Sequence, residues 1–165
     1  MTAPTWRWYA WPQLDPDTLY AFLKLRSDIF VVEQHCVFPE MDGLDPQCLH
    51  LCGRDTAGVL QAYLRLVPPG LDRPAHQVEG KRPSLPPGPA LGRLVVAATA
   101  RRSGLARAAI EEGLRLCAFR HGGLPVLLSA QQHLEAFYAS LGFERRGAPY
   151  REDGIWHVDM LRAEP

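Results

Sequence analysis

The sequence lacks an excess of charge of either sign, because 18 lysines and arginines balance 18 aspartates and glutamates. Proteins that bind nucleic acid or an anionic membrane surface usually carry a basic field, so neither class is indicated. Long apolar runs are also missing: none approaches the roughly 18 residues that a membrane-spanning helix needs. We therefore expect no nucleic-acid partner and no membrane partner, and any anion-binding site must be local.

Cysteine is scarce, with four residues, and nothing near the start of the chain reads as a secretory signal. Reduced thiols and a cytoplasmic location are the expectation. Cys48, His50 and Cys52 would share one face of a strand, and Cys36 could add a fourth ligand. Neighbours on one strand rarely close a tetrahedral shell, however, so we expect no metal.

What is present is an ordinary globular composition, with 165 residues, 47% hydrophobic and 22% charged. This length predicts one domain spanning residues 1–165 with a core of its own. Hydrophobic periodicity predicts helices over residues 18–32, 105–120 and 133–141. It predicts strands over residues 5–11, 48–53, 59–67, 91–97, 125–130, 143–146 and 155–161.

Two details qualify this pattern. Residues 68–90 hold seven of the fifteen prolines, which predicts a long surface loop without any element. Arg26 interrupts the apolar stripe of the first helix, so its charge must reach water or find a carboxylate. The order of elements predicts an α/β or α+β layered domain with a mixed sheet.

The most informative segment is Arg-Arg-Ser-Gly-Leu-Ala at residues 101–106, between a predicted strand and a predicted helix. First-turn amides of a helix have no intrahelical acceptor, and the helix dipole favours an anion there. Flanking arginines add charge-assisted donors to phosphate oxygens. The segment therefore suits a pyrophosphate, although a pair of arginines can equally be a solvated part of a loop.

The spacing Arg-x-x-Gly-x-Ala after an apolar strand resembles the acetyl-coenzyme A loop of the GNAT N-acetyltransferase superfamily. Three longer segments resemble its ElaA-like branch: LRSDIFVVEQ with MDGLD (25–34 and 41–45), AQQHLEAFYASLGF (130–143) and EDGIWHVDM (152–160). The matches run from about Leu19 to Met160, so the resemblance extends over nearly the whole chain. Ala106 stands where glycine is commoner, and Trp156 where proline is usual. The resemblance implies the GNAT fold, a central mixed β-sheet flanked by helices.

The resemblance also implies a reaction, the transfer of an acetyl group from acetyl-coenzyme A to an amine acceptor. Acetyl-coenzyme A would be the cosubstrate. The protein would be a monomer or a homodimer. The strand residues Leu94, Val95 and Val96 would pair with the pantetheine arm through their backbone, while their side chains pack in the core. The remaining coenzyme-binding residues would be Arg101, Arg102, Ser103, Gly104, Leu105, Ala106 and Gln131.

Three residues are candidates for the chemistry. In this family context Tyr138 suggests a general acid for the departing thiolate, against the alternative of a core tyrosine. Glu33 is the first choice as a base or an amine-orienting group, and an exposed helix-end acid is the other interpretation. His157 is an acceptor-site candidate, although a histidine inside a strand is commonly structural.

Other function classes fit less well. No Lys-Ser or Lys-Thr follows the glycine turn, which disfavours a P-loop nucleotidase. Gly104 is the only glycine of residues 101–106, which disfavours a dinucleotide-binding oxidoreductase. A non-catalytic acyl-coenzyme A binding or sensor protein stays open as an alternative. The acceptor stays open between a small amine, an antibiotic-like molecule, a peptide N-terminus and a protein lysine.

Overall fold

The computed structural model describes residues 4–71 and 78–163. The chain divides into two compact units, each treated by itself below. The first takes the chain up to Val67 together with Leu91–Gly113. The second takes Pro68–Ala90 and the chain from Leu114 onward. That the whole chain forms one domain stays a prediction.

The first unit is built on four strands in the order β1 (Thr5–Ala10), β2 (Leu49–Arg54), β3 (Leu60–Val67) and β5 (Ala90–Val96). Strand β5 belongs to this unit from Leu91 onward, and its first residue, Ala90, belongs to the second unit. Strand β2 pairs with both β1 and β3 in the antiparallel sense. The predicted hairpin between β2 and β3 is confirmed. Asp55 shapes its turn, because the carboxylate accepts hydrogen bonds from the backbone of Ala57 and Val59.

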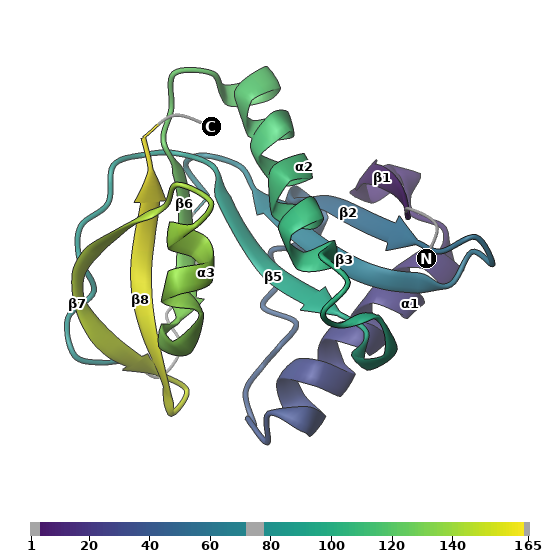
Figure 1. Cartoon of the computed structure of the whole chain (residues 1–165), viewed down its shortest axis with the longest axis horizontal. Coiled ribbons are helices and arrows are strands. Elements are labelled where there is room, and N and C mark those ends of the chain that lie inside the picture. The colour runs from purple at the N-terminus through teal and green to yellow at the C-terminus, as the bar shows by residue number, and fades with distance from the viewer. Residues whose placement is uncertain (1–3, 72–77, 164–165) are drawn as a thin grey trace. The chain divides into compact units, whose positions relative to one another are not determined.

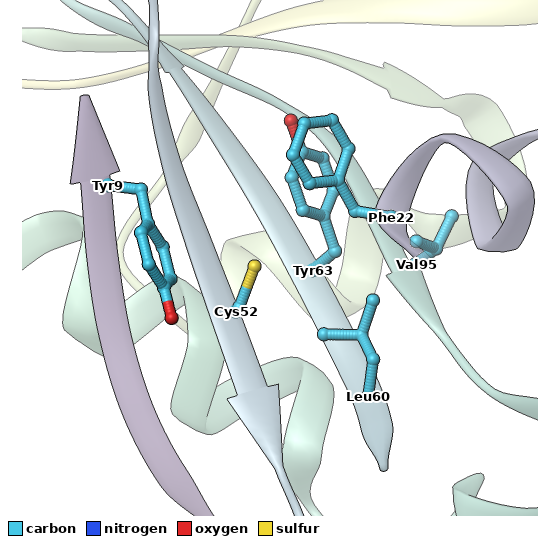
Figure 2. Close-up of a cluster of buried hydrophobic side chains, with 6 residues drawn as sticks. All are labelled: Tyr9, Phe22, Cys52, Leu60, Tyr63 and Val95. Atoms are coloured by element: carbon cyan, nitrogen blue, oxygen red, sulfur yellow. The ribbon is translucent and has the colours of Figure 1, made fainter. Parts of the chain in front are cut away.

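Helix α1 (Pro16–Ser27) begins where the sequence predicts, because Asp15 caps it by accepting a hydrogen bond from the Thr18 amide. The helix does not continue regularly to residue 32. It passes into a π-helix, η2 (Asp28–Glu33), a rare form that often marks functional sites. Phe22 of α1 stacks on Tyr63 with ring centroids 4.7 Å apart, inside the apolar cluster drawn in Figure 2.

Strand β5 leads through the short helix η4 (Ala98–Ala100) and a turn into α2 (Leu105–His121), as Figure 1 shows. Gly113 allows this helix to lie close to the strands of the first unit. A Cβ there would lie 2.8 Å from the Leu64 side chain and 3.0 Å from that of Leu91. The missing side chain therefore lets α2 pack closely on β3 and β5.

The second unit has four antiparallel strands in the order β6 (Val126–Gln131), β8 (Ile155–Arg162), β7 (Glu144–Glu152) and β4 (Val78–Glu79). Ala90, the first residue of β5, pairs with Leu127 in the parallel sense, so the sheet is mixed as predicted. Helix α3 (Glu135–Ala139) packs against β6 and β7. One face of β6 and β8 is apolar and buried, with Leu128, Ala130, Val158 and Met160.

Three predictions about the second unit were wrong in extent. The proline-rich segment 68–90 does contain an element, because β4 pairs with the end of β7, although residues 72–77 lie outside the described residues. The helix predicted over 133–141 is shorter, with a 3-10 turn, η5 (Gln132–Leu134), before α3. Strand β7 continues to Glu152, past an irregularity between Arg146 and Tyr150.

Candidate active site

The turn before α2 gathers the residues predicted to hold an anion. Residues 101–104 are exposed, and both Arg102 and Gly104 have positive φ values, 62° and 85°. The Gly104 carbonyl accepts the Ala108 amide at 3.0 Å, the bond that starts the helix. The amides of the first turn, at Leu105, Ala106 and Arg107, therefore have no intrahelical acceptor. This end of α2 can bind an anion through backbone donors and the helix dipole.

Arg101 and Glu33, two residues predicted for separate roles, lie together. Their side chains form an ion pair with 2.8 Å between nitrogen and oxygen, and both are about half exposed, at 42% and 48%. The hydrogen bond from Arg101 lowers the pKa of Glu33. A carboxylate held in this way is a weaker base, while its negative charge still suits the orientation of a cation.

Strand β5 carries the three residues predicted to contact the coenzyme. Val95 is buried in the core cluster, and Leu94 and Val96 are half buried. The strand is irregular one residue earlier, because Arg93 has a left-handed backbone conformation with φ 54°. A backbone contact to a ligand would not disturb the packing of these side chains.

The sequence left Arg26 without an assigned partner, and the structure supplies two. Arg26 is fully buried and donates to Glu40 at 2.8 Å and to Asp45 at 2.9 Å. Burial alone would lower the pKa of Arg26, but Tyr63 and the two carboxylates raise it. Arg26 therefore does not reach water but draws two acids of the segment 34–47 against α1.

Two more arginines extend this cluster. Arg65 of β3 donates to Asp42 at 2.6 Å and to Asp45 at 2.8 Å, and Arg93 of β5 donates to Glu40 at 2.9 Å. We call the six residues the charge cluster: Arg26, Glu40, Asp42, Asp45, Arg65 and Arg93. Three positive and three negative charges balance there, which is what burial of so many ions requires.

Tyr138 lies in the second unit, on α3. It is buried, with its ring edge-on to Phe137 and to Phe143 at centroid distances of 5.0 Å and 6.2 Å. Burial raises the pKa of Tyr138 to about 12. The phenol is therefore protonated at neutral pH, as a general acid must be.

His157 and Gln131 are brought together on β8 and β6, where they are direct partners in the antiparallel register. Tyr150 of β7 is the next residue in this row, and its ring stacks on the imidazole of His157. The Nδ1 of His157 lies 2.9 Å from the Ile155 carbonyl, which can only accept. Nδ1 therefore carries the proton in the neutral ring and leaves the Nε2 lone pair available.

Below this row the same sheet face holds a second polar group, which sequence reasoning missed. Tyr150 donates to Asp159 at 2.7 Å and also contacts the Ser129 hydroxyl. Arg82 of the proline-rich segment pairs with Asp159 at 3.1 Å and covers the Tyr150 ring. This segment thus covers part of a polar sheet face. The signal in the sequence was the alternation of polar Ser129 and Gln131 with apolar residues along β6.

The residues weighed as metal ligands are engaged otherwise. The ring nitrogens of His50 contact the Tyr63 hydroxyl at 2.8 Å and the Asp45 carbonyl at 2.9 Å. Burial raises the pKa of the thiols of Cys48 and Cys52 to about 11 and about 12. Within the described ranges no group of three histidine, cysteine or acidic side chains is placed to hold a metal ion.

Comparison with known proteins places this geometry in context. A family model described as an acetyltransferase (GNAT) domain matches residues 82–163. A UPF0039 protein of Synechocystis is 32% identical over 97% of this chain and 96% of its own length. The solved structure of an acyl-CoA N-acyltransferase from Pseudomonas aeruginosa superposes with a TM-score of 0.83 at 35% identity, covering 98% of this chain and 100% of that one.

A further relative is similar in both sequence and structure. ElaA of Escherichia coli is 33% identical over 91% of this chain and 90% of its own length. Its crystal structure superposes with a TM-score of 0.81, covering 96% of this chain and 99% of that one. None of the described helices is both long and apolar enough to cross a bilayer.

Proposed function

Because the chain belongs to the GNAT acetyltransferase family, in its ElaA-like branch, we propose that it moves an acetyl group from acetyl-coenzyme A to an amine. Acyl transfer from a coenzyme A thioester is the chemistry of the family. The acetyl group, the amine acceptor and the roles of single residues are our proposal. A cytoplasmic location and a monomeric or homodimeric state stay predictions.

The observation that carries the proposal is the turn at residues 101–106. Its first-turn amides, the positive end of α2 and two exposed arginines supply donors in one place, which is what a pyrophosphate needs. Arg101 pairs with Glu33, and exposed ion pairs of this kind contribute little stability. A multiply charged pyrophosphate would therefore take Arg101 from Glu33.

We assign the proton that the departing thiolate needs to Tyr138. The phenol has a raised pKa and is held among aromatic rings, so it is neutral until it donates. Backbone amides of Leu94, Val95 and Val96 would stabilise the developing oxyanion, which is usually the largest electrostatic contribution. The side chain of Gln131 would contact the coenzyme.

For the proton lost by the amine, we propose His157 as the base. Its Nδ1 lies against the Ile155 carbonyl, so Nε2 carries the lone pair that can accept a proton. Glu33 has the lowered pKa of a paired carboxylate, which suits it less as a base than as a group that orients a cationic amine. The two residues can thus have different roles in one reaction.

The test of this proposal is the binding of coenzyme A, measured by calorimetry and by the rise in melting temperature. Ligand that binds only the folded chain raises its stability by mass action. Arg101→Glu should weaken binding at least about tenfold, because charge-assisted bonds to phosphate are lost and a like charge is added. Arg120→Glu, at the opposite end of α2, is the matched control and should bind normally. Wild-type protein that does not bind coenzyme A would remove the proposal.

A non-catalytic acyl-coenzyme A binding protein would pass the same binding test. The Nε2 lone pair of His157, left over when Nδ1 donates to the Ile155 carbonyl, favours catalysis over this alternative, because a binding protein needs no base. Turnover decides between them.

A further inference from the structure

Arg93 occupies a position that no motif indicated, in the middle of β5 and one residue before Leu94. Its φ of 54° lies in the left-handed region, which a non-glycine residue adopts at a cost. Such strain persists only where the surroundings impose it, and it concentrates at functional sites. Contacts with the surrounding residues must therefore hold Arg93 in this conformation.

The side chain of Arg93 is bonded to residues of the segment 34–47. Its Nε donates to Glu40 at 2.9 Å, and one terminal nitrogen lies 3.3 Å from the Glu40 carbonyl and 3.3 Å from Asp42. The guanidinium also lies over the Phe38 ring, 5.8 Å from its centroid. The guanidinium of Arg93 therefore contacts three residues of a segment that is distant in sequence: Phe38, Glu40 and Asp42.

The carboxylates on which Arg93 acts are themselves fixed. Glu40 is shared with Arg26 of α1, and Asp42 is shared with Arg65 of β3. Both acids are almost completely buried, at 2% and 4% exposure of their side chains. The charge cluster thus presents Arg93 with rigid acceptors, and a lysine could not engage both in the same way because it lacks the planar fork.

We propose that Arg93 is a positioning residue: its side chain ties the segment 34–47 to β5, and its left-handed backbone sets the direction in which Leu94, Val95 and Val96 continue. The inference rests on the proposed function in one respect, the role of those three residues toward the thioester. A change in the conformation of the segment 34–47 would then alter β5, and a change in β5 would alter the segment. Arg93 does not itself touch the reacting atoms.

The test compares Arg93→Asn with Asp153→Asn. Asparagine tolerates the left-handed region, so both changes keep the backbone conformation, and Asp153 has a similar φ of 49° but lies in the second unit. Hydrogen exchange is measured in the ligand-free protein at the amides of Leu44 and Gln47 in the segment and of Ala97 at the end of β5. These amides have acceptors in Asp42, Leu44 and Gln61.

Arg93→Asn should speed exchange about tenfold or more at all three amides together, as for one local unit that opens cooperatively. Asp153→Asn should leave them unchanged. Glu40→Gln attacks the same tie from the segment, so the double variant should be hardly worse than the more affected single one. Arg93→Lys, which keeps a single charged donor, should recover part of the protection and serves where Arg93→Asn folds poorly.

The functional readout separates positioning from a structural role. Arg93→Asn should lower kcat at saturating acetyl-coenzyme A about tenfold, and Arg93→Lys should restore part of it. Faster exchange confined to Leu44 and Gln47, with Ala97 and kcat unchanged, would reduce Arg93 to an anchor of the segment and overturn the inference. Wild-type protein without coenzyme binding would instead remove the proposed function, while exchange still decides whether Arg93 joins segment and strand.

Discussion

At the scale of single residues, Tyr138 and His157 differ in the way their protons are held. The ring of Tyr138 packs edge-on to Phe137 and Phe143, and burial raises the pKa of its hydroxyl, so the hydroxyl keeps its proton. His157 has one nitrogen committed to the Ile155 carbonyl and the other available. One residue is thus suited to giving a proton and the other to taking one.

Removal of the Tyr138 hydroxyl should affect turnover far more than binding. We expect Tyr138→Phe to lower kcat and kcat/KM together by about 10²-fold, the pattern of an interaction made only in the transition state. Coenzyme affinity and melting temperature should stay close to wild type. Steady-state rates and thermal melts on one preparation measure both, with the exposed Tyr20→Phe as control. An unchanged rate together with a lower melting temperature would identify a core tyrosine instead.

Loss of the imidazole of His157 should change how the rate depends on pH. His157→Gln should lower kcat/KM about 10²-fold and remove the rise of the rate with pH that a general base produces. Profiles of kcat/KM against pH for wild type and variant make the comparison. His121→Gln, in the last turn of α2, should keep the wild-type profile. A variant that keeps the wild-type profile would leave water or Glu33 as the proton acceptor.

At this scale the sequence predicted that a buried charge needs compensation, but it did not predict which residues provide it. The interruption of an apolar stripe predicted that the charge of Arg26 must reach water or find a carboxylate, and the structure shows the second. It could not show that the partners are Glu40 and Asp45, because they lie 14 and 19 residues away in a segment without periodicity. The roles of Glu33, His157 and Tyr138 stay predictions, since they depend on ligands and not on the fold alone.

At the scale of elements, the segment 34–47 is held by buried ion pairs in addition to the buried side chains of Cys36 and Leu44. Burial alone would raise the pKa of Asp42, but Arg65 lowers it to about 2. The pKa of an ordinary aspartate in an unfolded chain is about 4. The lower value in the folded state means that ionised Asp42 stabilises the fold. This contribution is complete above about pH 4 and is lost as the pH falls through about 2.

Acid should therefore weaken the protein in a defined window. The free energy of unfolding, measured by urea titration from pH 6 to pH 2, should fall with an Asp42 contribution of about 2 kcal/mol below pH 4. Asp42→Asn should start less stable and lose about 2 kcal/mol less across the same window. Asp28→Asn, which removes an exposed partner of Lys24, should keep the wild-type slope. Equal slopes for Asp42→Asn and wild type would contradict the assignment.

The elements themselves were predicted well where the pattern is local. The cap of α1, the hairpin between β2 and β3, and the strand, turn and helix around residue 101 all follow from neighbouring residues. The π-helix η2 and the two-residue β4 were missed. The π-helix η2 is irregular, and β4 exists only through its pairing with β7, which no local pattern among prolines reveals.

At the scale of the whole molecule, the balance of charges means that an anion site must be local, and the turn before α2 is where we propose it. The family and the mixed α/β fold are established by motifs along nearly the whole chain and by relatives that match over most of their length. Turnover separates an acetyltransferase from a protein that only binds acyl-coenzyme A.

The most direct measurement is the release of free thiol from acetyl-coenzyme A in the presence of a panel of small amines, peptides and lysine-bearing proteins. Mass spectrometry of the acceptor accompanies it. The account predicts that at least one amine gives thiol release that depends on its concentration, a product heavier by one acetyl group, and loss of both signals in Tyr138→Phe. Protein that binds coenzyme A normally, yet transfers no acetyl group to any amine of the panel, would contradict the account and favour the binding protein.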